Sequence, residues 1–245
     1  MRGKLQESGF GDDPDFRWRG GDVSRLEGFS DAVFGFALTL LVVSLEAPSS
    51  YVALMEAVGG FFAFAFLFLM LYFLWYQHYI FFRRYGLNDF SLVMINGVLM
   101  FLTLFFVYPA KFLAEFLINF LFFGRFLGID IARNLDLSGF TFETYILTHS
   151  IYAGGFAALA GCYVAFYYIA LKKTEELDLN DKEYRITLSG CVSWSIVVAT
   201  ALLSILLVLI LPEDYAGMAS GFIFWLIPIG TIIANRRIMG KGQKS

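Results

Sequence analysis

The chain has 245 residues, of which 58% are hydrophobic and only 16% are charged, and its mean hydropathy is +0.68. Soluble domains usually contain about 45–50% apolar and about 25% charged residues, so this composition excludes an ordinary soluble globule, a disordered chain and a collagen-like fibre. The formal net charge is −3 at pH 7, which gives no basic field of the kind that attracts nucleic acid. The composition therefore indicates an integral membrane protein without a nucleic-acid partner.

Six apolar runs are candidates for helices that cross a bilayer. A helix needs about 20 apolar residues to cross roughly 30 Å of hydrocarbon. The runs lack the two-residue alternation of barrel strands, so we expect an all-α fold. The second and third runs are longer than required, which indicates tilting, kinking or projection beyond the lipid. The six predicted helices lie near residues 29–45, 52–82, 90–123, 145–171, 186–211 and 217–234.

Polar segments flank a six-helix domain that we place at residues 24–235. Residues 1–23 contain no apolar segment of the kind found in signal peptides, and we interpret them as a mobile cytoplasmic tail. Residues 236–245 are interpreted as a basic cytoplasmic tail. Of the 18 Lys and Arg residues, 15 fall on the side of the two tails and three on the opposite side. Because cytoplasmic segments carry the excess of Lys and Arg, both termini are predicted to be cytoplasmic.

The sequence lacks the residue patterns that would indicate an enzyme or a metal site. Cys162 and Cys191 lie in different apolar runs and match no zinc or CxxC spacing. The chain contains two histidines, and it has neither a GxSxG nor an HExxH motif. We therefore expect no catalytic residues, no bound metal and no cofactor.

The first predicted membrane helix carries most of the functional information. Ser24 followed by Glu27 is a capping-box pattern that begins a helix. Asp31 is followed by apolar residues, and a carboxylate at mid-bilayer costs roughly 2.5–3.5 kcal/mol on insertion scales. Two interpretations of Asp31 stay open: a specific polar partner within the membrane, or a position near the interface, where the cost is lower.

Beyond Asp31, helical spacing sorts the side chains of this helix. Phe36, Leu40 and Val43 share one stripe, and Thr39 borders it. Such a stripe is usually a packing surface or a lipid-facing surface. Spacing alone therefore gives little weight to the alternative that the stripe lines a pore.

Residues 25–31 read RLEGFSD, an R-x-x-x-F-S-D sequence at the start of the first membrane helix. This sequence resembles the signature of the transmembrane-protein-175 family of potassium channels. The similarity continues with Trp75-x-x-His78 in the second run, and with Asn96 and the later Pro109 in the third. It covers the six-helix unit and is sharpest in the first three helices.

The resemblance implies a particular architecture. Members of this family have no re-entrant pore loop and no TVGYG filter, and this sequence lacks TVGYG too. Their first helices surround a central axis, where rings of apolar side chains form the constriction. Prokaryotic members carry one six-helix repeat, as this chain does, and assemble as homotetramers. Carried over by position, the constriction residues are Phe36, Thr39, Leu40 and Val43.

Two of these positions depart from the family's usual pattern. Members usually have Ile or Leu at the position of Phe36, and Leu at the position of Val43. Four phenyl rings are bulkier and flatter than four aliphatic groups, so we expect the diameter, conductance and selectivity of the pore to depend on Phe36.

The resemblance also implies a polar network that braces the first helix against the second and third. An alternative for its histidine, His78, is contact with water or headgroups near the end of its helix. If Asp31 and His78 pair, their protonation makes channel opening sensitive to pH. The motif and bracing residues are Arg25, Phe29, Ser30, Asp31, Trp75, His78 and Asn96.

These features predict a potassium-preferring cation channel that conducts passively. A narrow apolar neck blocks ions by dewetting and conducts when it widens. Potassium holds its water less tightly than sodium, so such a neck can favour potassium without carbonyl ligands. The expected partners are potassium ions, the lipid bilayer and further copies of the chain, in a prokaryotic plasma membrane. The alternative is a secondary transporter, proton-coupled through Asp31, although we find neither paired internal repeats nor broken helices.

Overall fold

The computed structural model describes residues 15–43, 49–51, 54, 60–118, 139 and 141–240, and it leaves the side chain of Val43 undescribed. Within these residues every regular element is helical. Long apolar runs favour helices in lipid because a helix satisfies its backbone polar groups within the segment. The elements are α2 (Arg25–Val43), α4 (Phe61–Tyr85), α5 (Phe90–Glu115), α6 (Phe142–Lys172), α7 (Asp181–Ile210), α8 (Glu213–Phe222), the 3₁₀ helix η2 (Ile223–Trp225) and α9 (Leu226–Gly240).

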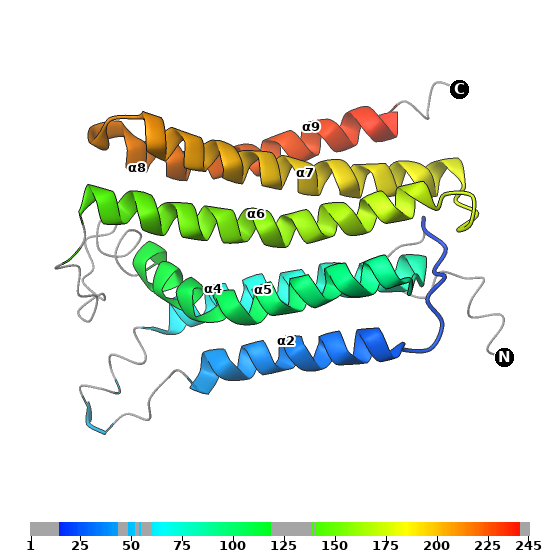
Figure 1. Ribbon diagram of the computed structural model, residues 1–245, viewed down its shortest axis with the longest axis horizontal. Coiled ribbons are helices and arrows are strands. Elements are labelled where there is room, and N and C mark those ends of the chain that lie inside the picture. The colour runs from blue at the N-terminus through cyan, green and yellow to red at the C-terminus, as the bar shows by residue number, and fades with distance from the viewer. Residues whose placement is uncertain are drawn as a thin grey trace.

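The long helices lie side by side in one elongated bundle (Figure 1). α2 lies at one edge of this bundle and contacts α4 and α5. α6 packs between α5 and α7, and α7 in turn packs against α8 and α9 at the opposite edge. The edge position leaves the outer side of α2 without a neighbouring helix in the described part of the chain.

Five helical segments are long and apolar enough to cross a membrane. α2, with 19 residues, is not among them, and its first turns carry three charged residues, Arg25, Glu27 and Asp31. It remains the candidate for the sixth predicted crossing. The five segments are Phe61–Tyr85, Phe90–Ile118, Phe142–Lys172, Asp181–Ile210 and Glu213–Gly240.

The helix boundaries differ from the predicted ones at several places. The last span extends over Glu213–Gly240, beyond the predicted 217–234 at both ends. Arg236 and Arg237 therefore lie in α9 and not in a separate basic tail. The positions of the predicted spans and tails that lie outside the described residues are 1–14, 44–45, 52–53, 55–59, 119–123 and 241–245.

Residues 15–23, which we expected in a mobile tail, pack against the helices, and we call them the N-terminal strap. The ring of Phe16 is only 2% exposed and belongs to the main apolar core. Arg19 forms an ion pair of 2.6 Å with Glu183 of α7, whose side chain is fully buried. The tail prediction is wrong over this segment because the partners of the strap come from distant helices that only the tertiary fold brings together.

A left-handed turn at Gly86 makes room for the strap at the end of α4. Its φ of 60° lies in the region that favours glycine, and a Cβ there would lie 2.8 Å from the carbonyl oxygen of Arg19. Gly20 of the strap is as close, since its Cβ would lie 2.6 Å from the carbonyl oxygen of Phe82. The Gly20 N–H donates to the carbonyl oxygen of Arg83 at 2.9 Å. These close approaches fix the strap on α4.

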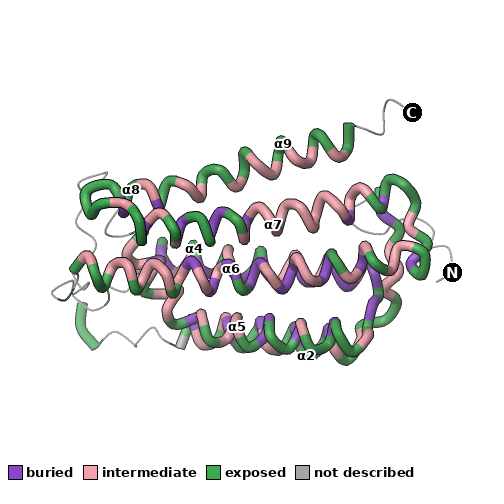
Figure 2. The backbone as a smooth tube through the Cα atoms, turned by 45° about the horizontal axis from the view of Figure 1, so that its top comes forward, coloured by how far each residue is buried: buried purple, intermediate pink, exposed green. Residues whose placement is uncertain are grey.

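Two apolar clusters form the interior of the bundle, where Figure 2 shows the buried positions. The main cluster joins α4, α5 and α6 and includes Phe81 and Phe166, whose rings lie 5.0 Å apart between centroids. The second cluster packs behind the C-terminal half of α2. Its buried members are Ala37, Leu41, Ala63, Leu67, Leu71, Val107 and Ala114.

Candidate functional site

The start of α2 is held by a cap and an ion pair. The Glu27 N–H donates to Ser24 Oγ at 3.2 Å, and the Ser24 N–H donates to Glu27 Oε2 at 2.8 Å. This is the predicted capping box, which the geometry confirms. The other oxygen of Glu27 lies 3.3 Å from Arg83 Nη2 of α4, and both side chains are largely buried, at 11% and 13% exposure. One carboxylate therefore both caps α2 and ties it to α4.

One side of α2 is uncovered along its length (Figure 2). Phe36 is 63% exposed and Phe29 is 59% exposed, an exposure that large apolar side chains on the outer faces of other helices share, among them Phe101 at 65%. The Thr39 hydroxyl donates to the carbonyl oxygen of Gly35 within the helix, at 2.9 Å. We call this side the open face of α2, and it comprises Gly28, Phe29, Ala32, Gly35, Phe36, Thr39 and Val42.

The four predicted constriction positions do not share one environment in the single chain. Phe36 and Thr39 belong to the open face, whereas Leu40 is half-buried and packs against the second cluster. Leu40 therefore lies at the border between the open face and the interior. Val43 is the last residue of α2, and its side chain lies outside the described residues.

A chain of buried polar groups joins α2 to α5 and α4. Ser30 Oγ donates to the carbonyl oxygen of Leu26 at 2.8 Å and accepts from Asn96 Nδ2 at 2.8 Å. Asn96 Oδ1 lies 2.8 Å from His78 Nε2. Because an amide oxygen only accepts, His78 carries its proton on Nε2 in this contact. Ser30, Asn96 and His78 are all 0–1% exposed, so each polar contact replaces water that cannot reach the group.

Asp31 has a different partner. Trp75 Nε1 donates to Asp31 Oδ1 at 2.8 Å, and the indole is flanked by Tyr72 and Tyr79, at 5.4 and 5.7 Å between ring centroids. Asp31 itself lies on the exposed side of α2. Its carboxylate therefore has a specific partner and also an open side that water or ions can reach.

The structure brings together some of the sequence-predicted residues and leaves others apart. Among the described residues, Asp31 and His78 share no hydrogen bond, because each has its own partner. Arg25 and Phe29 are exposed and join neither group of hydrogen bonds within that part of the chain. A simple pH switch would need a direct hydrogen bond between Asp31 and His78, and the hydrogen bonds of the described residues do not include one.

Two contacts of Arg83 were missed by reasoning from sequence. In the sequence Arg83 counts only among the 15 Lys and Arg residues on the side of the two tails, whereas in the structure it forms the ion pair with Glu27. Arg83 Nη1 also donates to the carbonyl oxygen of Gly21 in the strap, at 2.6 Å. The signal in the sequence was the presence of acidic Glu27 and basic Arg83 at the same predicted end of neighbouring helices.

The fold and this first helix define a multi-pass integral membrane protein. The family model for the endosomal/lysosomal potassium channel TMEM175 matches residues 25–107, which contain α2, α4 and most of α5. A potassium channel of Marivirga tractuosa is 35% identical over 247 residues, covering 98% of this chain and 97% of that protein. The chain belongs to the TMEM175 family.

Further similarities agree with this assignment. A potassium channel of Chamaesiphon minutus is 31% identical over 130 residues, covering 46% of this chain and 63% of that protein. The crystal structure of a variant of the potassium channel MtTMEM175, in complex with a nanobody–MBP fusion protein, superposes with a TM-score of 0.81 at 35% identity. That superposition covers 94% of this chain and 99% of the other. The family and these relatives are ion channels, so the prediction that the chain is not an enzyme is confirmed.

Proposed function

We propose that this protein is a potassium-preferring cation channel that conducts passively through a constriction formed by α2. The observation that carries the proposal is the open face of α2, where Phe36 is 63% exposed although α2 contacts two other helices. Contact with lipid would also account for exposed apolar side chains, but this face differs from the lipid-facing ones because it combines Phe36 with the small residues Gly28, Ala32 and Gly35 and lies beside Asp31 and a buried polar chain. The names of the relatives supply the permeant ion, potassium.

The constriction is assigned to Phe36, Thr39, Leu40 and Val43. A ring of Phe36 side chains around a central axis would exclude water and block ions until the ring widens. The hydroxyl of Thr39 donates its hydrogen to the carbonyl oxygen of Gly35 within the helix, so its exposed oxygen can still act as an acceptor for a cation. Selectivity then arises from the cost of stripping water from each cation, with the Thr39 oxygens replacing part of the lost hydration.

The assembly that places α2 around an axis is a homotetramer. α2 lies at the edge of the bundle, so its open face can meet the α2 helices of other copies (Figure 1). Gly28, Ala32 and Gly35 recur at helical spacing along this face, and small residues allow membrane helices to approach closely. Four first helices, one from each copy, would then enclose the pore.

The remaining polar groups act as the support of α2. Ser30, Asn96 and His78 fix its rotation, so that Phe36 points away from the bundle. The hydrogen bond between Asp31 and Trp75 holds the N-terminal half of α2, beside the open face, against α4. We assign these residues, with Arg25 and Phe29 of the motif, to positioning the pore helix.

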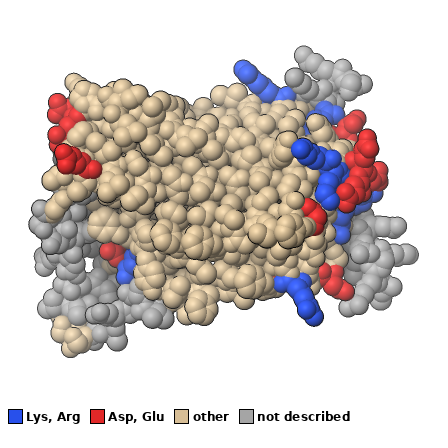
Figure 3. Space-filling model, viewed as in Figure 1, with Lys and Arg blue, Asp and Glu red and all other residues tan. Residues whose placement is uncertain are grey.

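The charge distribution supports an orientation with both termini in the cytoplasm of a prokaryotic cell. Figure 3 shows a middle zone without charged side chains on this face, and Lys and Arg gathered mainly at the end where α2 begins. The strap, the end of α4, the connection from α6 to α7 and the end of α9 all lie at this end. An excess of Lys and Arg is typical of the cytoplasmic side of a membrane protein.

The channel and the secondary transporter are separated by recording from purified protein in a planar bilayer with opposed potassium and sodium gradients. A passive potassium-preferring channel gives unitary current steps whose reversal potential is displaced toward the potassium equilibrium potential. Equal permeability for the two cations would reject the selectivity. A silent bilayer, together with gradient-coupled uptake into liposomes, would reject the channel in favour of the transporter through Asp31.

A further inference from the structure

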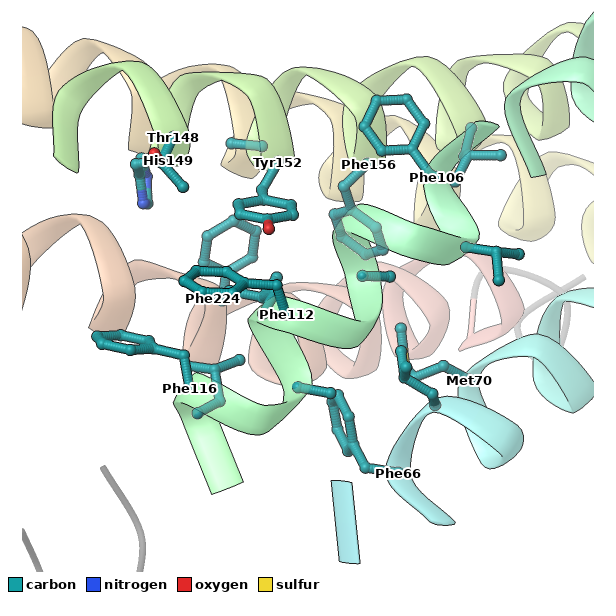
Figure 4. Close-up of a pocket in the computed structure, with 18 of the residues that line it drawn as sticks. Phe66, Met70, Phe106, Phe112, Phe116, Thr148, His149, Tyr152, Phe156 and Phe224 are labelled. Atoms are coloured by element: carbon teal, nitrogen blue, oxygen red, sulfur yellow. The ribbon is translucent and has the colours of Figure 1, made fainter. Parts of the chain in front are cut away.

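A cavity of about 590 Å³ lies between α4, α5, α6 and the segment formed by α8, η2 and α9 (Figure 4). This volume is in the range of roughly 300–1,000 Å³ that is typical of small-molecule sites. Met70, Phe106, Phe112, Tyr152, Phe156 and Phe224 are among the side chains that line it. The proposed pore at the open face of α2 uses none of these residues.

Two of the polar side chains at this cavity, Tyr152 and His149, already have partners. Tyr152 OH donates to the carbonyl oxygen of Pro109 at 2.7 Å, and His149 Nε2 lies 2.7 Å from Ser204 Oγ. The described residues that line the cavity include no Asp, Glu, Lys or Arg. A charged or strongly polar ligand would lose its hydration there and gain few hydrogen bonds in return. A hydrocarbon needs no such partner.

The cavity also reaches the outer surface of the bundle. Phe66 and Phe112 line it and are 37% and 39% exposed, so they connect its interior with the side that faces lipid in a membrane-spanning chain. Pro109 lies inside α5, where a proline bends a helix, and α5 changes direction near this end (Figure 1). At Gly221 of α8, an added Cβ would meet no atom within 4 Å. Phe66 and Phe112 therefore mark where a chain can enter the cavity from the bilayer.

We propose that this cavity binds one acyl chain of a membrane phospholipid. An apolar cavity does not hold ordered water, and its lining lacks contact partners as long as it is empty. The bilayer supplies unbranched hydrocarbon chains at high local concentration at this depth. A chain in the cavity restores the missing van der Waals contacts without requiring a polar partner.

The site has a direct connection to α2. Leu41 of α2 lines the cavity and also belongs to the second cluster, which packs behind the C-terminal half of that helix. An acyl chain would therefore support the rear of the helix that carries the constriction. This consequence rests on the proposed function, whereas lipid binding itself does not.

The test is photolabelling of the full-length protein in vesicles of phosphatidylcholine that carries a diazirine on its acyl chain. After irradiation, labelled peptides are mapped by mass spectrometry. Leu206 and Leu209 of α7, which are 50% and 59% exposed, provide the reference for lipid contact at the surface. We expect label on Met70, Phe106 or Tyr152 at a level comparable with this reference. Cavity labelling no higher than that of the buried core around Phe81 would overturn the proposal, and this readout needs no variant.

A pair of variants tests whether the label reports the cavity. Gly221→Leu adds a side chain at a residue that lines the cavity and should lower the ratio of cavity to surface labelling several-fold. Gly154→Leu is the control, because its Cβ also meets no atom within 4 Å and Gly154 is not among the described residues that line the cavity. A ratio of cavity to surface labelling that Gly221→Leu leaves unchanged would contradict the assignment.

A diazirine-bearing free fatty acid is used in parallel, and label from it alone would overturn the assignment to a phospholipid. Because no arm measures current, a silent channel does not affect the result.

Discussion

Asn96 Nδ2 of α5 donates a hydrogen bond to Ser30 Oγ of α2 over 2.8 Å, and both side chains are fully buried. The same amide accepts from His78 of α4 through its oxygen. A single amide therefore links three helices. Apolar contacts have no preferred direction, whereas a buried amide has only a few positions that satisfy its hydrogen bonds. This contact gives α2 a defined rotation in the bundle.

Replacing Ser30 by Ala removes the acceptor of Asn96 and leaves a buried N–H without its partner. We expect a loss of about 1–3 kcal/mol in the free energy of unfolding, the usual cost of such a group. The measurement is thermal unfolding in detergent, with unitary current as a second readout of α2 position. Ser195→Ala is the control, since the Ser195 hydroxyl donates to the carbonyl oxygen of Cys191, four residues earlier in the same helix. Equal unfolding temperatures for the two variants would contradict the bracing role.

The Arg83→Gln variant tests the ion pair at the start of α2. Removing the guanidinium of Arg83 leaves the carboxylate of Glu27 largely buried without a counter-charge. It also removes the hydrogen bond to the carbonyl oxygen of Gly21. Buried pairs cost about 3–5 kcal/mol when one partner is removed and exposed pairs about 0–1 kcal/mol, so we expect about 1–3 kcal/mol for this partly shielded pair. Thermal unfolding of the variant and the wild type at low and high salt measures this loss of stability. Arg237→Gln, at an exposed arginine of α9, should leave stability unchanged; a loss as large as that of Arg83→Gln would point to net charge instead.

Much of the fold could be predicted from the sequence because a segment in lipid must satisfy its own backbone hydrogen bonds, which leaves few possible structures. Long apolar runs must become helices, and the Ser24–Glu27 spacing marks a helix start whose hydrogen bonds the structure contains. Helical spacing also placed Phe36 and Thr39 near each other on one side of α2. These features depend only on residues close together in the chain.

The features that could not be predicted depend on which distant residues meet. Spacing gives the face of a helix but not the neighbour that covers it, so Leu40 was grouped with Phe36 although the second cluster half-buries it. The partner of Asp31 is Trp75 and not His78, because His78 points to Asn96 inside the bundle. The strap was interpreted as a tail for the same reason, since no local pattern reveals that Phe16 enters the core.

If the α2 helices of different copies approach closely, a larger side chain at Gly35 should weaken their association. A Cβ at Gly35 meets no atom within 4 Å in the single chain, so Gly35→Leu should leave the helical content of the chain unchanged. In a tetramer the added side chain would separate neighbouring α2 helices and favour monomers. Light scattering of the purified protein in detergent, with circular dichroism on the same sample, measures both. Gly161→Leu of α6, where Cβ is equally free, is the control. An intact tetramer in Gly35→Leu would remove Gly35 from the interface.

The hydroxyl of Thr39 should contribute to the preference for potassium. Thr39→Ala removes the oxygen that replaces part of the lost hydration, so the permeability ratio of potassium to sodium should fall while unitary currents persist. Reversal potentials under opposed gradients measure this ratio. Thr231→Ala provides a chemical match, because Thr231 Oγ1 also donates to the carbonyl oxygen four residues earlier, that of Ile227. If both variants keep the wild-type ratio, Thr39 has no part in selectivity.

Whether the open face of α2 lines the conduction pathway is tested most directly by cysteine accessibility at Phe36. The background carries Cys162→Ala and Cys191→Ala, which removes both native cysteines. A cationic methanethiosulfonate reagent is added to Phe36→Cys channels during single-channel recording. Phe222→Cys of α8, at a residue that is 65% exposed in the chain, serves as the matched control. We predict an irreversible reduction of the unitary current in Phe36→Cys and none in Phe222→Cys. Current that the reagent leaves unchanged in Phe36→Cys, although mass spectrometry shows that the introduced thiol has been modified, would contradict the assignment of α2 to the pore.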